Sequence, residues 1–160
     1  LEVKSGDDVF LDYGSGMGRA LIVAALYPFN KIVGVEFSAT LNAIAENNVR
    51  QAYEKLRCKD IEIITANAMT YVPPQSTTVF FLFNPFNNEI LEAVLGKIRE
   101  SLAAKPREIK IIYQRGNGHD AALDDLDWLT RCGSYRSYYY DGCRREAVLY
   151  RSSIDFSATT

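Results

Sequence analysis

The sequence DYGSGMGR at residues 12–19 combines a carboxylate with closely spaced glycines, a pattern that can bind a ligand. Gly14, Gly16 and Gly18 allow the backbone to turn sharply and to approach a ligand, because glycine has no Cβ atom. Asp12 adds a negative charge, which favours a positively charged ligand over a phosphate. The alternative interpretation is a glycine-rich turn that binds nothing.

A dinucleotide fits this pattern poorly. The dinucleotide fingerprint GxGxxG/A, counted from Gly14 and Gly16, requires a small residue at the position of Arg19. That fingerprint also presents a helix N-terminus to a pyrophosphate, beside which an acid would be unfavourable. Two interpretations of Arg19 stay open: an ion pair with a carboxylate, or a cap of the helix that follows.

Two more polar groups follow predicted strands. Glu36 ends the strand pattern KIVGVEF, and its carboxylate could accept hydrogen bonds from two ribose hydroxyls or simply face solvent. Asn84, Pro85 and Phe86 directly follow VFFLF at residues 79–83, a continuously apolar run that predicts a strand buried on both faces. Asn-Pro is also a good start for an ordinary turn.

The elements that position these residues alternate along the chain. Strand patterns occupy residues 9–12, 31–37, 61–64, 79–83, 109–113, 135–140 and 145–150, and helical patterns occupy 20–27, 41–56, 88–102 and 120–129. Ser38 and either Asn87 or Asn88 are predicted N-caps. Alternating strands and helices predict a parallel sheet covered by helices on both faces. Asp141-Gly142 favours a tight antiparallel hairpin near the end.

The predicted fold is therefore α/β: a single three-layer Rossmann-like domain with a mostly parallel seven-stranded sheet and a C-terminal antiparallel hairpin. The length of 160 residues and a hydrophobic content of 48% fit one domain. We expect the domain at residues 1–151 and a weakly held tail at 152–160. Because the chain begins with Leu rather than Met, we also expect a leading segment before residue 1.

Composition narrows the partners and the location. A net charge of −2 disfavours a general nucleic-acid footprint, although a local basic patch is compatible with it. No apolar run approaches the roughly 20 residues that span a membrane. Cys58, Cys132 and Cys143 are widely spaced and form no metal-binding pattern, which favours free thiols and a cytoplasmic location.

At this point the sequence resembles the class I, seven-strand S-adenosylmethionine-dependent methyltransferases. The resemblance rests on the Asp-x-Gly-x-Gly-x-Gly loop, the acid in GVEF, the Asn-Pro-Phe segment and the terminal hairpin. GSGMGRALIVAA and GVEFSATLNAIAENN are most similar to small bacterial methyltransferases of unassigned substrate and to seven-strand protein-lysine methyltransferases.

The resemblance implies S-adenosylmethionine as the cofactor and no metal. It places cofactor contacts at Asp12, Tyr13, Gly14, Ser15, Gly16, Gly18, Glu36, Phe37, Asn67, Ala68 and Asn84, and catalytic groups at Asn84, Pro85 and Phe86. The chain departs from the family at two points. Asn67 stands where an Asp is usual, and a single proline follows Asn84 where amino-group methyltransferases carry two.

We therefore expect methyl transfer to a nitrogen of a protein lysine or of another amine. A small-molecule methyltransferase of the same fold and a non-catalytic interaction subunit are the alternatives. His119 could act as a base on the substrate side or could be an ordinary loop histidine.

Overall fold

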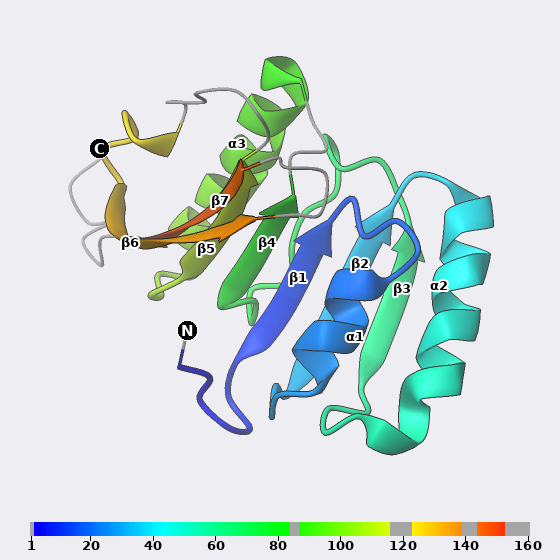
Figure 1. Ribbon diagram of the computed structural model, residues 1–160. Helices are drawn as coiled ribbons and strands as arrows, with labels where there is room; N and C mark the ends of the chain where they lie inside the picture. Colours follow the sequence, from blue (N-terminus) through cyan, green and yellow to red (C-terminus); the bar gives the residue numbers. More distant parts are fainter. Residues whose placement is uncertain (1, 84–86, 116–122, 139–143, 153–160) are drawn as a thin grey trace.

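The computed structural model describes residues 2–83, 87–115, 123–138 and 144–152 (Figure 1). Its elements are β1 (Val9–Tyr13), α1 (Arg19–Ala25), β2 (Lys31–Glu36), α2 (Ala39–Ala52), the 3-10 helix η1 (Tyr53–Lys55), β3 (Ile61–Thr65), β4 (Val79–Phe83), α3 (Asn88–Ala104), β5 (Lys110–Arg115), β6 (Leu129–Tyr138) and β7 (Arg144–Ser152).

The strands form one seven-stranded sheet in the order β3-β2-β1-β4-β5-β7-β6. The neighbours from β3 to β5 pair in parallel, whereas β7 pairs antiparallel with both β5 and β6. The mostly parallel sheet with an antiparallel end is therefore confirmed. From β1 the sheet extends to β2 on one side and to β4 on the other, and ligands of open α/β sheets bind at the carboxyl ends of strands at such a point.

Helices α2 and α3 begin where their capping residues predict. The Ser38 hydroxyl accepts a hydrogen bond from the Leu41 N–H at 3.3 Å, and the Asn87 side chain accepts one from the Ile90 N–H at 3.0 Å. Each cap satisfies an N–H group of the first turn that has no partner within the helix.

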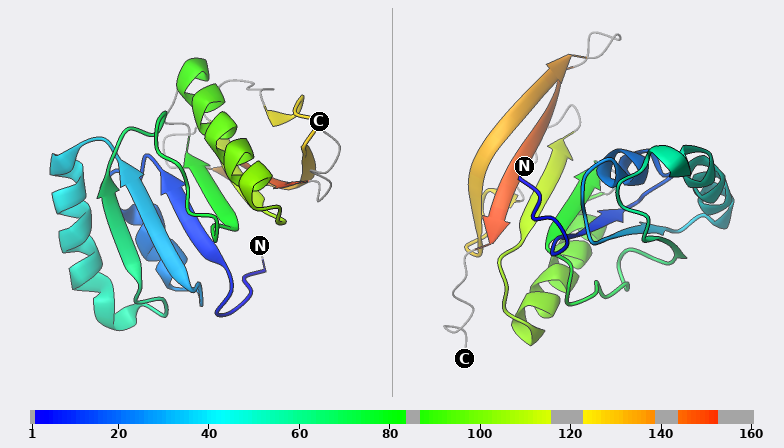
Figure 2. Two further views of the ribbon diagram at one scale, coloured as in Figure 1. Left: turned by 180° about the vertical axis from the view of Figure 1, so that it is seen from behind. Right: turned by 90° about the horizontal axis from the view of Figure 1, so that it is seen from below.

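Helices lie on both faces of the sheet, but they do not cover it completely. The apolar side chains of α1 and the end of α2 pack with one cluster of sheet residues, and α3 packs with another on the opposite face (Figures 1 and 2). On α3 the packed face consists of Leu91, Val94, Leu95, Ile98 and Leu102, each worth about 1.5–3 kcal/mol of burial. Among the described residues, no helix lies over β4 and β5 on the α1 side, so the full three-layer arrangement is not confirmed.

This incomplete cover corrects the expectation for residues 79–83. On β4 the side chain of Phe81 is only half-buried and that of Phe83 is 40% exposed, although Val79, Phe80 and Leu82 are buried. An apolar strand is buried on both faces only where both faces are covered. The sequence of a strand does not contain that information.

Two other expectations need adjustment near the C-terminal end. The helix predicted at 120–129 is wrong for its described part, because 123–128 form turns and β6 begins at Leu129. The last strand, β7, includes Ser152, the first residue of the expected tail. Its buried hydroxyl accepts a hydrogen bond from the Ile109 N–H at 3.0 Å. The Asp141-Gly142 turn and residues 153–160 lie outside the described residues.

Candidate functional site

The glycine loop leaves β1 and folds back over the end of β2. The backbone N–H groups of Gly14 and Ser15 both donate to the carbonyl of Val35, at 2.7 and 3.1 Å. Gly14, Gly16 and Gly18 have φ angles of 79°, 53° and 80°. This left-handed region strains any residue with a side chain. The sharp turn predicted from the glycines is therefore present.

Two glycines also allow close packing around the loop. A Cβ atom on Gly18 would lie 3.0 Å from the Cβ of Ala45 in α2. A Cβ atom on Gly34 in β2 would lie 2.6 Å from Leu21 and 2.9 Å from the hydroxyl of Ser15. The missing side chain at Gly34 thus lets the loop and α1 approach the sheet.

Glu36 connects this loop to the end of β2. Its carboxylate accepts hydrogen bonds from the N–H of Gly16 at 3.0 Å and from the N–H of Ser38 at 2.9 Å. A carboxylate offers about four acceptor positions, so about two remain for a ligand. Glu36 is partly exposed, so those positions can be reached from solvent.

Asp12 is the second carboxylate of the site and is almost completely buried. Its side chain is 2% exposed, and its Oδ1 atom has no hydrogen-bond partner among the described residues. Burial and, to a smaller extent, the negative charge of Glu36 together raise the pKa of Asp12 from 3.8 to about 7. A buried acceptor without a partner is costly, so Asp12 is suited to a ligand that brings a donor or a positive charge.

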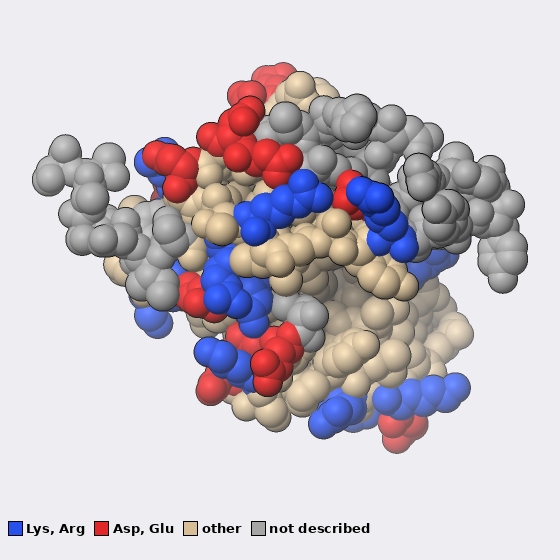
Figure 3. All heavy atoms as spheres, turned by 60° about the vertical axis from the view of Figure 1, so that its left-hand side comes forward, with Lys and Arg blue, Asp and Glu red and all other residues tan. Residues whose placement is uncertain are grey.

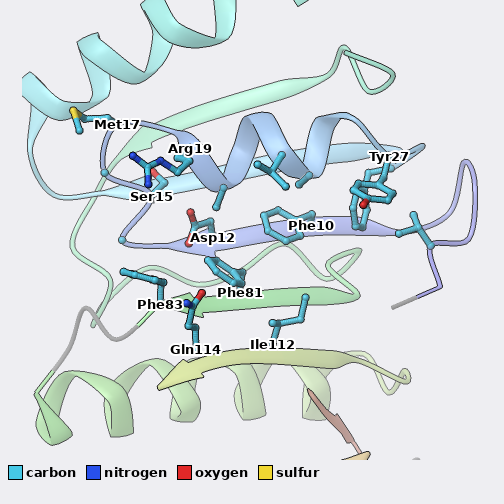
Figure 4. Close-up of a pocket in the computed structure, with 17 residues that line it drawn as sticks. Phe10, Asp12, Ser15, Met17, Arg19, Tyr27, Phe81, Phe83, Ile112 and Gln114 are labelled. Atoms are coloured by element: carbon cyan, nitrogen blue, oxygen red, sulfur yellow. The ribbon is translucent and has the colours of Figure 1, made fainter. Parts of the chain in front are cut away.

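Asp12 faces a cavity of about 740 Å3 between α1 and the sheet (Figure 4). The floor is formed by side chains that alternate along three neighbouring strands: Phe10 and Asp12 of β1, Phe81 and Phe83 of β4, and Ile112 and Gln114 of β5. Residues of the glycine loop and one side of α1 form the wall. The cavity is apolar along most of its length, and polar groups gather at the carboxyl ends of the strands.

Comparisons with known proteins agree with this arrangement. Residues 2–72 match the family model described as Histone methylation protein DOT1. An uncharacterized protein of Listeria monocytogenes serotype 4b superimposes with a TM-score of 0.73 at 14% identity, over 98% of this chain and 66% of the other. Solved methyltransferases from Streptococcus pneumoniae and Synechocystis PCC 6803 share this arrangement, which is the fold of the class I S-adenosylmethionine-dependent methyltransferases.

Two further solved structures have this methyltransferase fold. A candidate tRNA (m1A22) methyltransferase of Streptococcus pneumoniae, Sp1610, has a TM-score of 0.70 at 16% identity, over 93% of this chain and 65% of the other. Magnesium protoporphyrin IX methyltransferase of Synechocystis PCC 6803, with bound SAM, has a TM-score of 0.66 at 14% identity, over 90% of this chain and 69% of the other. The chain spans slightly less than two thirds of the Listeria and Streptococcus proteins. No curated protein matches the sequence significantly.

The site residues present fit S-adenosylmethionine. The unpaired, buried Oδ1 of Asp12 lies beside the glycine loop, where the cationic methionine part of the cofactor would bind. Glu36 has acceptor positions left for the two ribose hydroxyls. Phe37, which follows Glu36, is 76% exposed and offers an apolar surface for the adenine ring.

Tyr13 contributes differently from what the resemblance implied. Its side chain is buried on the α3 face of the sheet, opposite to Asp12, and its hydroxyl donates to the carbonyl of Tyr71 at 3.2 Å. The side chain therefore points away from the cavity, and only the backbone of Tyr13 lies beside the glycine loop.

Asn67 and Ala68 follow β3 at the same edge of the sheet. The side-chain oxygen of Asn67 accepts a hydrogen bond from the N–H of Met69 at 3.0 Å, which closes a local turn. The side-chain N–H groups of exposed Asn67 are left as the donors that an adenine ring could use. The Asp that is usual in the family could accept this turn hydrogen bond but could not donate.

The expected catalytic segment Asn84, Pro85 and Phe86 lies outside the described residues, as does His119. Arg19 is exposed at the cavity wall, and no ion pair or cap involving it occurs in the described part of the chain. Among the residues that the structure describes, neither interpretation of Arg19 is therefore realised.

Sequence reasoning missed Gln114 and Phe83, which line the cavity near Asp12 (Figure 4). Their positions at the carboxyl ends of predicted strands were the available signal, because that edge is where ligands bind.

One face of the molecule carries charged side chains of both signs (Figure 3). On the face in Figure 3, Lys and Arg side chains lie among Asp and Glu side chains. Arg131 and Arg136 both approach the carboxylate of Glu146, at 3.3 and 3.6 Å. Within the described ranges, no group of three metal-ligating side chains occurs, and no helix has the length and apolar character to cross a bilayer.

Proposed function

We propose that this protein is an S-adenosylmethionine-dependent methyltransferase that acts on an amine nitrogen. The observation that carries the proposal is Asp12, an almost fully buried carboxylate that has an unpaired oxygen and belongs to a residue lining the cavity beside a glycine loop. This is an environment for a cation, and it is unfavourable for a pyrophosphate.

In this proposal the residues of the chain bind and orient the cofactor. Asp12 would hold the cationic part of the cofactor, and Glu36 would hold the ribose at the neighbouring strand end. When bound, the cofactor supplies an electrophilic methyl group. Methyl transfer would form an N–C bond at the acceptor nitrogen as the C–S bond of the cofactor breaks, with the electron pair left on sulfur and the proton of the nitrogen released to solvent. Alignment of the reacting groups can supply on the order of 7–11 kcal/mol.

For the acceptor we propose a lysine of a protein. The match of residues 2–72 to a family model described as a histone methylation protein supports this choice. The net charge of −2 and the mixed charges on the face in Figure 3 favour a protein or a small molecule over nucleic acid. Asn84, Pro85 and Phe86 remain the proposed catalytic segment. The thiols of Cys58 and Cys132, both free, support a cytoplasmic location.

A small-molecule methyltransferase is the second candidate. The apolar cavity beside Asp12 favours it, because its volume of about 740 Å3 is within the usual range of small-molecule sites.

Thermal unfolding with S-adenosylhomocysteine or with NAD tests the cofactor. We expect S-adenosylhomocysteine at about 100 times its Kd to stabilise the folded chain by about 2.7 kcal/mol, and NAD to have no effect. Stabilisation by NAD would indicate a dinucleotide enzyme, and no shift with either ligand would indicate an interaction subunit. Transfer of labelled methyl groups to lysate proteins or to a metabolite fraction then distinguishes the two acceptor classes.

A further inference from the structure

One face of α2 holds three separate parts of the proposed cofactor site. Asn42, Ala45 and Asn48 follow one another at intervals of three residues, which places them along one side of the helix. Ala45 lies against Gly18, and the side-chain amide of Asn48 donates to the carbonyl of Met17 at 3.0 Å. Asn42 makes the contacts that reach furthest into the sheet.

Asn42 joins the carboxyl ends of β2 and β3. Its side-chain amide nitrogen donates to the carbonyl oxygen of Glu36 at 3.3 Å and to the hydroxyl oxygen of Thr65 at 2.7 Å. Glu36 and Thr65 are the last register pair of the two strands. Asn42 thus ties both strand ends to α2 at the level where β2 and β3 stop.

Packing alone does not account for an asparagine at this position. The side chain of Asn42 is 4% exposed, and its Oδ1 atom has no partner in the described part of the chain. The carbonyl of Glu36 already accepts a hydrogen bond from the Ala66 N–H at 3.1 Å. A leucine of similar size would fill the same space without leaving a buried polar atom unpaired.

The hydrogen bonds of Asn42 lie next to the expected contacts of the ribose and the adenine. The same Glu36 that Asn42 holds by its main chain presents its carboxylate to the ligand side. Thr65 directly precedes residues 66–68, where the adenine contact is expected. Ribose and adenine would therefore bind between two strand ends whose spacing Asn42 fixes.

We propose that Asn42 is a positioning residue for the adenosine part of the cofactor. It acts through Glu36 and Thr65 and does not itself touch the ligand, because its amide is buried behind them. This inference rests on the proposed S-adenosylmethionine site and adds a residue to it.

A double-mutant cycle tests the inference through ligand affinity. Asn42→Leu, Glu36→Gln and the double variant are titrated calorimetrically with S-adenosylhomocysteine and with adenosine. We expect Asn42→Leu to lower the affinity for both ligands by about tenfold when Glu36 is present. In the Glu36→Gln background the loss should be less than threefold, because the effects of coupled residues are not additive. Asn47→Leu, an exposed change on the same helix, should leave both affinities unchanged.

If Asn42 only stabilised the fold, Asn42→Leu would give a different result. It would lower the melting temperature of the ligand-free chain while the affinity either stayed constant or fell by the same factor in both Glu36 backgrounds. Either result overturns the inference and leaves the methyltransferase proposal intact. Failure of the parent chain to bind S-adenosylhomocysteine overturns both.

Thr65→Val provides a second, milder variant should Asn42→Leu not fold. It removes the hydroxyl that Asn42 contacts at 2.7 Å and keeps the shape of the side chain. We expect it to weaken adenosine binding by severalfold, again with a smaller effect in the Glu36→Gln background. An unchanged affinity for Thr65→Val, or a loss of the same size in both backgrounds, counts against the positioning role.

Discussion

Glu36 accepts a hydrogen bond from the backbone N–H of Gly16 at 3.0 Å, so the acid at the end of β2 also holds the glycine loop of β1. The two halves of the proposed cofactor site are thereby joined before any ligand binds. Because the loop is already held, less ordering remains to be done when a ligand binds, which favours affinity.

Replacement of Glu36 by Gln should weaken S-adenosylhomocysteine binding by about tenfold or more. The amide keeps the shape but loses the charge, and it has fewer acceptor positions for the loop N–H and the ribose hydroxyls together. Isothermal calorimetry measures the loss. Glu62→Gln, a change in an exposed ion pair with Lys31, serves as the control and should bind like the parent chain.

Replacement of Asp12 by Asn should stabilise the ligand-free protein, and more so at higher pH. The pKa of Asp12 is about 7 in the folded chain and 3.8 as its ordinary value. Between these values the folded state keeps a proton that the unfolded state has lost, so Asp12 lowers stability as pH rises. The full penalty, present above pH 7, is on the order of 4 kcal/mol.

Urea unfolding of the parent and the Asp12→Asn variant at pH 5 and pH 8 checks this trend. The stability difference between them should be clearly larger at pH 8. A difference that does not vary with pH would mean that Asp12 is already ionised at pH 5 in the folded chain.

Binding of S-adenosylmethionine should have the opposite pH dependence, because it requires the ionised form of Asp12. With a pKa of about 7, the affinity should fall about tenfold between pH 8 and pH 6. Calorimetric titrations across this range measure the slope. In Asp12→Asn the affinity should be low throughout and independent of pH, whereas the same slope in both proteins would assign the titration to another group.

Gly18→Ala should destabilise the chain and weaken cofactor binding together. A φ of 80° costs an alanine roughly 1–2 kcal/mol, and the new Cβ would also lie 3.0 Å from the Cβ of Ala45. Gly96→Ala in α3 is the matched control, since a Cβ there meets nothing within 4 Å. That change should stabilise by up to about 1 kcal/mol. Chemical unfolding of both variants measures the change in stability. Calorimetric titration with S-adenosylhomocysteine measures the change in cofactor binding.

The cofactor loop could be predicted from sequence because its signals are local. Three glycines after a short apolar strand dictate a left-handed turn, and no distant residue is needed to produce it. The strand pattern ending in Glu36 similarly placed an acid at the correct edge of the sheet. The capping side chains of Ser38 and Asn87 act within one helical turn and were predictable for the same reason.

Only the tertiary structure decided which side chains face the site and which support it. Asp12 and Tyr13 are neighbours in sequence but project to opposite faces of β1, into different surroundings. Phe83 is exposed because no described helix covers its face, although its run of five apolar residues predicted burial. Asn42 reaches Glu36 and Thr65 only after α2 has packed on the sheet. Burial and long-range hydrogen bonds depend on how elements assemble, and local sequence does not specify that.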